Sequence, residues 1–400
     1  MRNNDNQEKI LENNEQRIIE ALNRSLEEPD PPVTPLLRMK HISHLDLDGY
    51  GATLLSELLA AEYPDGAMTL EIVNILPNKL NSEMEQTLAN IDNYDLIVIT
   101  DLAVNQALVD MINNHPQGSK VRVFDHHLCE IKDLPENFIV TEQSPIYPDK
   151  LTCATELYYN FIKNDKVYTL FNRQSLRNAI AYFVECVRVY DTFEFWNTRN
   201  DTINEIGITY FDAPRLNTLF HIMDRDEFKE YVKYYLNATD WVYMTVSSKE
   251  YPWISKVLEL EYNKNAKYVE SAIRRMVKTP FKYVVYKNGE VHNLNYNIGV
   301  IFAEKSSPII ANTALERNTD IDFCAVVSNN QISIYSNKEN IDVSKIARIF
   351  GGGGHKEAAG FTIPYINASV FNMQHFEKII MCAGQLIPYD GEDDDISDVN

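Results

Sequence analysis

The sequence predicts an α/β protein with two domains, in which a mainly parallel sheet is followed by a smaller α/β unit. Three observations support this prediction. The chain has 400 residues, which favours two domains over one. Short β-rich runs alternate with helix-length segments in the first half, and a two-residue period returns after a long amphipathic stretch. A hydrophobic content of 44% is enough for a core in each domain.

Four apolar runs predict the strands of the first sheet. They are LLRMKHIS (36–43), LEIVNILP (70–77), DLIVIT (95–100) and KVRVFD (120–125). The segments between them have helical length and pattern, which indicates βαβ units and a mainly parallel sheet. Functional residues in such sheets gather at the carboxyl ends of the strands. A lead-in over residues 1–35 ends in the breaker cluster EPDPPVTP.

The rest of the chain changes character twice. Residues 151–240 are helical in pattern, and the amphipathic stretch 253–278 is suited to connect two domains. Strands are then expected in FKYVVYKN (281–288), NIGVIFAE (297–304), DFCAVVSN (322–329) and QISIYSN (331–337). We therefore expect a lead-in (1–35), a first domain (36–250), a helical linker (251–280), a second domain (281–388) and an acidic tail (389–400).

Charge and composition narrow the class of function. A net charge of −21 argues against a protein that coats long nucleic acids, although a short nucleic-acid substrate remains compatible with it. The five cysteines form no CxxC pair, which argues against a zinc knuckle or a disulfide framework. No apolar run approaches the roughly 18 residues of a membrane helix, and the N-terminus lacks a signal-peptide core. We expect a cytoplasmic protein.

The stretch HLDLDG places His44, Asp46 and Asp48 at every second position, just where a strand should lead into a helix. The two aspartates are equally compatible with helix capping. In the functional interpretation, the alternation directs the three side chains to one side of a fraying strand, while Gly49 and Gly51 allow a tight turn into the helix.

Three further segments offer the same types of side chain. Asp101 follows the strand DLIVIT, and Asp125, His126 and His127 end the strand KVRVFD. Asp191 ends an amphipathic helix, and by itself it is better explained as a surface or capping residue. Adjacent histidines on a strand point to opposite sides, so a structural role explains one of them more easily than both.

Taken together, these residues predict a metal site. The carboxyl ends of parallel strands converge on one crevice, so the series HxDxD, D, DHH, D would meet there. Mixed imidazole and carboxylate ligands suit manganese or a related divalent ion. Two such ions with a bridging carboxylate are typical of enzymes that displace phosphoryl groups.

In this series and in the later GGGGH motif, the chain resembles the DHH family of phosphoesterases, in the subgroup with a C-terminal DHHA1 domain. The likeness covers about residues 36–365. The small bacterial oligoribonucleases called nanoRNases are the most similar group, and cyclic-dinucleotide phosphodiesterases and RecJ exonucleases share the architecture. The resemblance implies two Mn²⁺ ions, although other divalent ions would also fit the ligands.

The resemblance also implies a role for each residue. His44, Asp46 and Asp101 would hold one ion, whereas Asp48, Asp101, His126 and Asp191 would hold the other, with Asp101 as the bridge. Asp125 would orient its neighbours, and His127 would face the scissile phosphate. The second domain would bind the terminal nucleotide through Gly351, Gly352, Gly353, Gly354, His355, Lys356, Ser344 and Tyr335. A flexible hinge is the alternative explanation of the four glycines. Many relatives have an arginine in a strand that reads SxRS, where this chain has SIYS with Tyr335.

The predicted function is a manganese-dependent exonuclease that degrades short single-stranded RNA or dinucleotides to mononucleotides. Alternatives are a cyclic or linear dinucleotide phosphodiesterase, an adenosine 3′,5′-bisphosphate phosphatase, and a catalytically inactive nucleotide-binding protein. No membrane partner is expected, and a homodimer is left open. His41 is expected to pack inside the protein, and HIMDRDEF (221–228) to form a solvated face. Four further histidines stand outside the motifs: His115, His221, His292 and His375.

Overall fold

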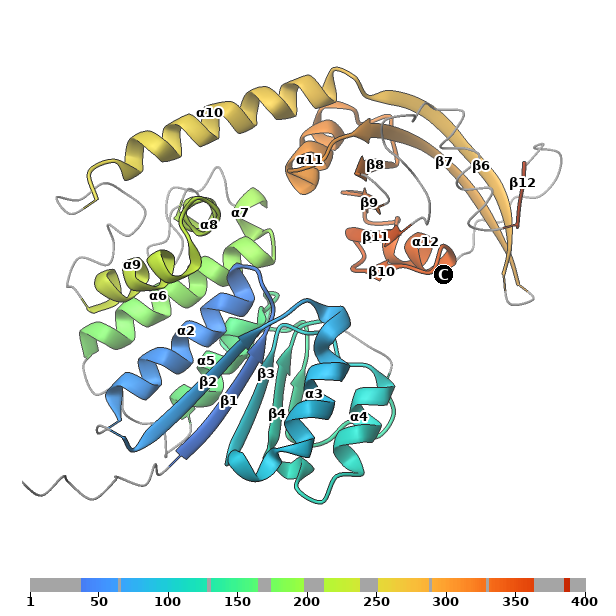
Figure 1. The fold of residues 1–400 in the computed structure, drawn as a ribbon. Coiled ribbons are helices and arrows are strands. Elements are labelled where there is room, and N and C mark those ends of the chain that lie inside the picture. The colour runs from blue at the N-terminus through green and yellow to red at the C-terminus, as the bar shows by residue number, and fades with distance from the viewer. Residues whose placement is uncertain are drawn as a thin grey trace, which may run out of the picture. The chain divides into compact units, whose positions relative to one another are not determined.

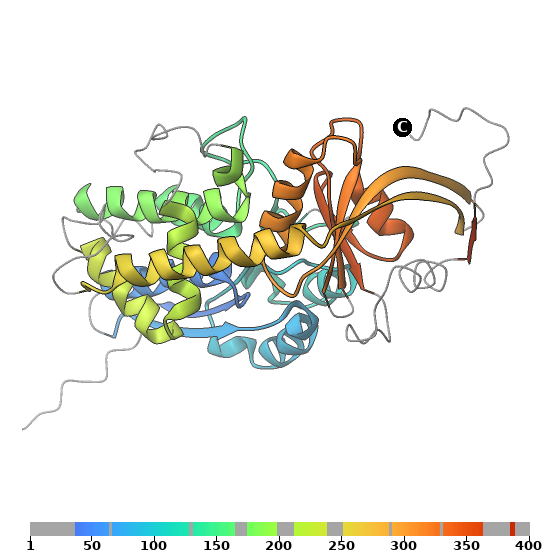
Figure 2. The ribbon, with the colours of Figure 1, turned by 90° about the horizontal axis from the view of Figure 1, so that it is seen from above.

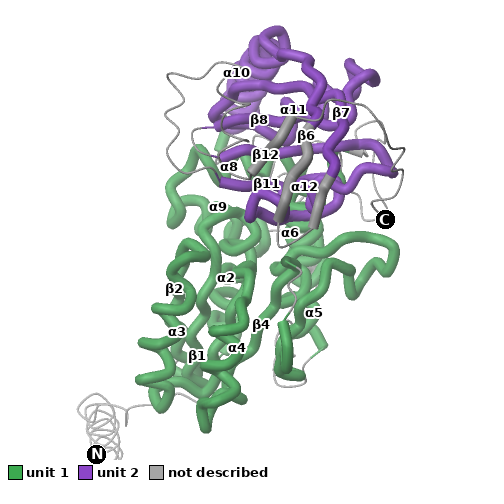
Figure 3. The backbone as a smooth tube through the Cα atoms, turned by 90° about the vertical axis from the view of Figure 1, so that its right-hand side faces the viewer, with its two compact units in different colours: residues 1–252 green, residues 253–400 purple. Residues whose placement is uncertain are grey.

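The chain forms two compact units, residues 1–252 and residues 253–400 (Figure 3). The computed structural model describes residues 37–63, 66–127, 131–164, 174–197, 212–237, 251–287, 290–328, 331–362 and 385–388. The predicted lead-in and the predicted acidic tail lie outside these residues. Within them, no helix combines the length and the apolar character that crossing a membrane requires.

The first unit is built on a five-stranded sheet in the order β2-β1-β3-β4-β5. Every pair of neighbouring strands is parallel. The strands are β1 (Leu37–Ser43), β2 (Met68–Asn74), β3 (Leu96–Thr100), β4 (Val121–Asp125) and β5 (Phe138–Val140). The predicted parallel sheet and its four strands are therefore confirmed. The additional strand β5 is only 3 residues long, which is too short to show a periodic pattern.

Helices cover both faces of this sheet (Figure 1). Those between the strands are α2 (Leu47–Glu62), α3 (Leu80–Ala89) and α4 (Gln106–Asn113), with short 3₁₀ turns at Pro77–Lys79, Ile91–Asn93 and Gly118–Lys120. After β5 come α5 (Ala154–Asn164), α6 (Gln174–Asp191), α7 (Glu194–Asn197), α8 (Asp212–Ile222) and α9 (Arg225–Asn237). Met84 of α3 and Leu108 of α4 pack with Ile97 and Ile99 of β3 in one core cluster. This packing fixes the strand ends that bear the candidate site.

The second unit begins with helix α10 (Ile254–Ile273) and continues as a seven-stranded sheet in the order β10-β11-β9-β8-β7-β6-β12. Its strands are β6 (Val277–Lys287), β7 (Glu290–Phe302), β8 (Phe323–Ser328), β9 (Gln331–Tyr335), β10 (Gly353–Gly354), β11 (Ala358–Thr362) and β12 (Gln385–Pro388). Only β7 and β8 pair in parallel among these described strands.

One helix packs on each face of the second sheet (Figure 2): α11 (Ser307–Arg317) on one and α12 (Val343–Ile349) on the other. Successive strand residues alternate between the two cores. Val300 belongs to the cluster that includes α12, whereas Ile301 belongs to the cluster of α10 and α11. The expected second α/β unit is thus confirmed.

The predicted amphipathic helix 253–278 is too long at its end. Helix α10 stops at Ile273, and strand β6 begins at Val277. Pro280 explains the difference, because a proline disfavours helical backbone in the residue before it. The division into units also places α10 within the second unit, whereas the sequence suggested a separate linker. The domain limits themselves stay a prediction.

Candidate active site

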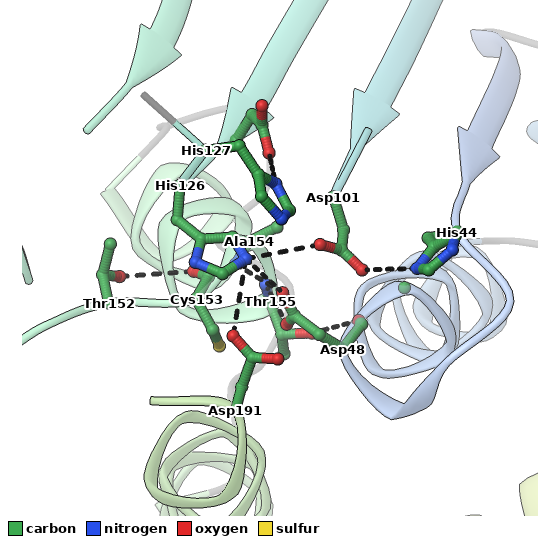
Figure 4. Close-up of polar contacts among 12 residues, drawn as sticks. His44, Asp48, Asp101, His126, His127, Thr152, Cys153, Ala154, Thr155 and Asp191 are labelled. Atoms are coloured by element: carbon green, nitrogen blue, oxygen red, sulfur yellow. Dashed lines mark hydrogen bonds and ion pairs between the residues drawn. The ribbon is translucent and has the colours of Figure 1, made fainter. Parts of the chain in front are cut away.

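The predicted ligands lie at the carboxyl edge of three adjacent strands and at the end of one helix (Figure 4). His44 follows β1 and Asp101 follows β3, while Asp125 is the last residue of β4. Asp191 is the last residue of α6. Because β1, β3 and β4 are neighbours in the sheet, their ends bring these residues together.

The HLDLDG segment differs from the predicted frayed strand. Strand β1 stops at Ser43 and helix α2 already starts at Leu47. Asp46 is the N-cap residue and accepts a hydrogen bond of 3.1 Å from the amide of Gly49, as the capping explanation required. Asp48 lies in the first helical turn, so it joins a different group of residues from His44 and Asp46.

The two glycines of this segment allow close approach and do not form a special turn. Among the described glycines, positive φ angles occur at other positions. A Cβ atom on Gly49 would lie 2.5 Å from the carbonyl oxygen of His44, and one on Gly51 would lie 2.7 Å from Oγ1 of Thr155. Gly49 thus lets α2 start against the backbone of His44, and Gly51 lets α5 approach α2.

His44, Asp46 and Asp101 form one group of potential ligands. The Nδ1 atom of His44 lies 2.8 Å from Oδ2 of Asp46 and 3.5 Å from Oδ2 of Asp101. The carboxylates of Asp101 and Asp46 together raise the pKa of His44 to about 10. Burial alone would raise the pKa of Asp46, but the interactions with His44 and Asp101 outweigh it and lower that pKa.

Asp48, His126 and Asp191 form a second group. The Nε2 atom of His126 lies 3.4 Å from Oδ2 of Asp191, 3.9 Å from Oδ2 of Asp48, and 3.4 Å from Oδ1 of Asp101. Asp101 therefore presents one oxygen to each group. Burial and the neighbouring acids raise the pKa of Asp101, and burial above all raises the pKa of Asp191 to about 7. Burial opposes the charge of His126, yet Asp191 and Asp48 raise its pKa overall.

The backbone of Asp101 adopts an unusual conformation. Its φ angle is 55°, in the left-handed region that most residues with side chains avoid. The amide of Asp101 donates a hydrogen bond of 3.1 Å to the carbonyl oxygen of Phe124 in β4, which holds the turn in place. Such strain persists where the surroundings enforce it, and it is common at functional sites.

Helix α5 anchors Asp48, a feature that the sequence did not reveal. The amides of Ala154 and Thr155 donate hydrogen bonds of 2.7 and 2.8 Å to the two carboxylate oxygens of Asp48. The hydroxyl of Thr155 donates to the backbone carbonyl of Asp48 at 2.6 Å. The only sequence signal for this contact is the threonine at the start of the helical run CATELYYNFI.

His127 and Asp125 form a separate pair. The Nδ1 atom of His127 lies 2.8 Å from Oδ1 of Asp125, which is fully buried, whereas the imidazole is 44% exposed. The rings of His126 and His127 have centroids 4.3 Å apart. The expectation that they point to opposite sides of a strand is wrong, because β4 ends before both histidines. Asp125 thus fixes the orientation of His127.

The arrangement fits divalent ions. One carboxylate oxygen of each of Asp101, Asp125 and Asp191 is buried without a hydrogen-bond partner among the residues that the structure describes. Burying such charges is costly unless a cation compensates them. Three overlapping groups have ligand atoms within 4.8 Å of one another; they are His44, Asp46 and Asp101, Asp48, His126 and Asp191, and Asp101, His126 and His127. Imidazole nitrogens and carboxylate oxygens suit manganese and related ions.

His41 supports the site from below, in the packed position that the sequence predicts. Its Nδ1 atom lies 2.8 Å from Oγ of Ser56, and its Nε2 atom lies 2.9 Å from Oγ1 of Thr100. The hydroxyls of Thr100 and Ser43 lie 2.6 Å apart. This buried network ties β1 and α2 to the residue that precedes Asp101.

The other histidines take no part in the three groups. His115 accepts a hydrogen bond of 3.2 Å from the amide of Gln117, and His221 is exposed at the end of α8. The side chain of His292, and His375 as a whole, lie outside what the structure describes.

The four glycines in the second unit form a turn and a short hairpin. Gly351 and Gly354 have φ angles of 79° and 136°, and Gly353–Gly354 form β10, which pairs with β11. A Cβ atom on Gly352 would lie 2.0 Å from the carbonyl oxygen of Gly360. These contacts give the segment a defined backbone, in contrast to the hinge explanation.

The remaining predicted substrate-binding residues differ in exposure. His355 and Lys356 are exposed directly after the hairpin strand β10. Ser344 is only 6% exposed, and its hydroxyl lies 2.6 Å from the carboxylate of Asp342, the N-cap residue of α12. Tyr335 is half-buried against the α11 core cluster, and burial raises its pKa to about 12. A role of these residues in substrate binding stays a prediction.

Comparison with known proteins adds family matches in both units. The model of the DHH family N-terminal domain matches residues 41–184, and the DHHA1 domain model matches residues 294–380. Oligoribonuclease NrnB of Bacillus subtilis (strain 168) is 30% identical over 335 residues, which cover 81% of this chain and 73% of that protein. A 3′,5′-cyclic-nucleotide phosphodiesterase of Helicobacter pylori (strain ATCC 700392 / 26695) is 25% identical over 376 residues, with coverage of 86% and 98%. Among solved structures, RecJ of Thermus thermophilus in complex with Mn²⁺ has a TM-score of 0.49 at 14% identity, with coverage of 86% and 52%.

Proposed function

Because the chain belongs to the DHH family of phosphoesterases and has a DHHA1 domain, we propose that it is a manganese-dependent phosphodiesterase that degrades short oligoribonucleotides to mononucleotides. The observation that supports this most strongly is the position of Asp101 between the two groups of potential ligands. The relative named oligoribonuclease NrnB, which this chain matches over 81% of its length, supports the choice of substrate.

In this proposal the two groups hold two ions. His44, Asp46 and Asp101 hold one, and Asp48, Asp101, His126 and Asp191 hold the other, so that Asp101 is shared. When bound, such a pair of divalent ions supplies a water of lowered pKa and stabilises the charge that develops on a phosphoryl group. The amides of α5 keep Asp48 in place for this role, since they bind both of its oxygens.

His127 acts on the substrate itself. Asp125 binds its Nδ1 atom and so directs Nε2 away from the buried pair. From there Nε2 faces the scissile phosphate and donates a hydrogen bond to one of its oxygens. The partial exposure of the imidazole, 44%, allows a substrate to reach it.

The second domain binds one end of the substrate, which favours short chains over internal cleavage. Exposed His355 and Lys356 provide polar contacts, and Gly351 and Gly353 have no atoms within 4 Å of a virtual Cβ, so a phosphate or sugar can approach the backbone. Ser344 and Tyr335 contribute to the same region. Tyrosine does not neutralise a phosphate as arginine does, so we expect it to pack against a base or sugar.

A product-resolved assay with Mn²⁺ tests this function. End-labelled RNAs of graded length, a cyclic dinucleotide, a cyclic mononucleotide and adenosine 3′,5′-bisphosphate are offered separately, with Asp101→Ala protein as the blank. Release of mononucleotides from the shortest RNAs supports the proposal, and the label gives the direction of degradation. Absence of turnover on every substrate, with Mn²⁺ still bound, would support a nucleotide-binding protein without catalysis.

A second candidate function keeps the chemistry and changes the substrate. The relative named 3′,5′-cyclic-nucleotide phosphodiesterase matches this chain over 98% of its own length, which favours cyclic nucleotides as the alternative. Turnover of a cyclic substrate alone in the same assay would select this function. Turnover of the bisphosphate alone would indicate a phosphatase.

A further inference from the structure

Arg225 lies against two aromatic rings at the turn between α8 and α9. Its guanidinium carbon is 3.6 Å from the ring centroid of Phe220 and 5.6 Å from that of Tyr50. One of its nitrogens donates a hydrogen bond to the carbonyl oxygen of Phe220. The sequence predicted a solvated face for this segment, but the structure places this arginine, half-buried, over helix α2.

Tyr50 locates this arginine near the candidate metal groups. The amide of Tyr50 donates a hydrogen bond of 3.0 Å to the carbonyl oxygen of Asp46, one helical turn earlier. Helical side chains lean toward the N-terminus, so the ring of Tyr50 covers the first turn of α2. That turn includes Asp48 and follows Asp46 directly. Arg225 therefore lies beside the start of the helix that presents both aspartates.

His221 lies in the same region. Its ring centroid is 5.4 Å from that of Phe220, and it is exposed at the end of α8. Burial and the charge of Arg225 lower the pKa of His221, and the charge of Asp46 opposes them. Both electrostatic neighbours indicate that the end of α8 lies between Arg225 and the first ligand group.

The charge of Arg225 is not compensated locally. Among the described residues it makes no ion pair, and its hydrogen bond to Phe220 uses one nitrogen only. Lys229 also lies over Tyr50, at 5.4 Å, but its amine is 2.5 Å from a carboxylate oxygen of Glu57. The carboxylate of Asp224 accepts a hydrogen bond of 2.8 Å from the amide of Glu227. Arg225 thus keeps free N–H groups next to a site rich in carboxylates.

We propose that Arg225 binds a second, non-scissile phosphate of the nucleotide substrate, with His221 beside it in the same subsite. This inference rests on the proposed function and specifies its substrate: a short oligonucleotide that bears a terminal phosphate. A guanidinium matches two phosphate oxygens at once, and stacking on Phe220 and Tyr50 fixes the plane of the fork before the substrate arrives. Its positive charge also attracts an anion toward a protein with a net charge of −21.

The test compares three adenylate dinucleotides with Mn²⁺: one with a 5′-terminal phosphate, one with a 3′-terminal phosphate, and one with neither. In the wild-type protein we expect kcat/KM to be about tenfold higher for one phosphorylated form than for the unphosphorylated one. Arg225→Gln should abolish this preference mainly by raising KM for the phosphorylated form. Arg225→Lys should restore part of it, because it keeps the charge and loses the fork.

Lys229→Gln is the matched control, since it removes a cation over the same ring that Glu57 already neutralises. It should keep the wild-type preference. If the wild-type protein discriminates and Arg225→Gln and Arg225→Lys both retain the full preference, the subsite is overturned and the proposed function stands. A wild-type protein that turns over all three forms equally would also overturn it. If no dinucleotide or longer RNA is hydrolysed, the proposed function fails instead.

Discussion

Asp101 shows how one residue concentrates the chemistry of the site and its cost. It is buried, adopts a strained backbone conformation and lies near the carboxylates of Asp48, Asp46 and Asp191, which raise its pKa together with burial. Without a cation these like charges oppose folding, and with one they become ligands. The same side chain should therefore limit the stability of the ion-free protein and be essential for activity.

Replacing Asp101 by asparagine tests this link. We expect manganese-dependent hydrolysis to fall by about 100-fold or more, because a shared ligand is lost. In a chelator, the free energy of unfolding should rise by about 1 kcal/mol, since a buried charge is removed and asparagine tolerates positive φ. Urea titration and the product assay measure the two effects. Retained activity, or a loss of stability in the chelator, would contradict this account.

His41 gives the protein a defined pH dependence. Complete burial, with a smaller effect of the charge of Lys229, lowers the pKa of His41 from 6.5 to about 3. Below pH 6.5 the unfolded chain gains a proton that the folded chain does not accept. The contribution of His41 to the free energy of unfolding therefore falls as the pH drops from 6.5 toward 3, by about 1.4 kcal/mol per pH unit.

A difference measurement isolates this effect from the titration of other groups. The free energy of unfolding is measured in urea at pH 7 and pH 5 for the wild-type protein and for His41→Gln. Wild type minus variant should shrink by about 2 kcal/mol between the two values. A difference independent of pH would mean that His41 accepts a proton in the folded state.

At the scale of elements, the junction of β1 and α2 separates what the sequence could predict from what it could not. The strand, the helix and the acids near their junction follow from apolar patterning. The division of HLDLDG between two ligand groups does not, because it depends on the start of α2 at Leu47 and on the amides of Ala154 and Thr155. Those amides lie 106 and 107 residues from Asp48, and only the folded chain brings them together.

Gly51 provides a test of that contact between helices. A Cβ atom there would lie 2.7 Å from Oγ1 of Thr155 and 3.4 Å from Cγ2 of Val187. Gly51→Ala should therefore destabilise the protein by about 1–3 kcal/mol, although alanine favours a helix intrinsically. Urea unfolding measures the change.

Thr155→Ala is the partner variant in a double-mutant cycle, because it removes the atom that Gly51→Ala would meet. The two changes together should cost less than the sum of their separate effects. Strict additivity would show that α2 and α5 can move apart freely, and that the close approach is not needed.

For the whole molecule, the parallel sheet of the first unit made the site predictable, whereas the second unit was harder to read. Adjacent strand ends converge, so histidines and aspartates after β1, β3 and β4 were expected to meet. The hairpin strand β10 has 2 residues, both glycine, and thus has no apolar pattern to detect. The position of Arg225 depends on the packing of α8 and α9 against α2, which local periodicity does not encode.

All the proposed ion ligands lie between His44 and Asp191, within the first unit. Mn²⁺ should therefore stabilise only the unfolding of that unit, by about 2.7 kcal/mol at 100 times the dissociation constant. Ile298→Ala marks the other unit, since Ile298 is fully buried in the α12 core cluster and its truncation should cost about 2–5 kcal/mol. Calorimetry with and without Mn²⁺, on both proteins, should show the ion raising one transition and Ile298→Ala lowering the other. If Mn²⁺ instead raises the transition that Ile298→Ala lowers, the ion site is not confined to the first unit.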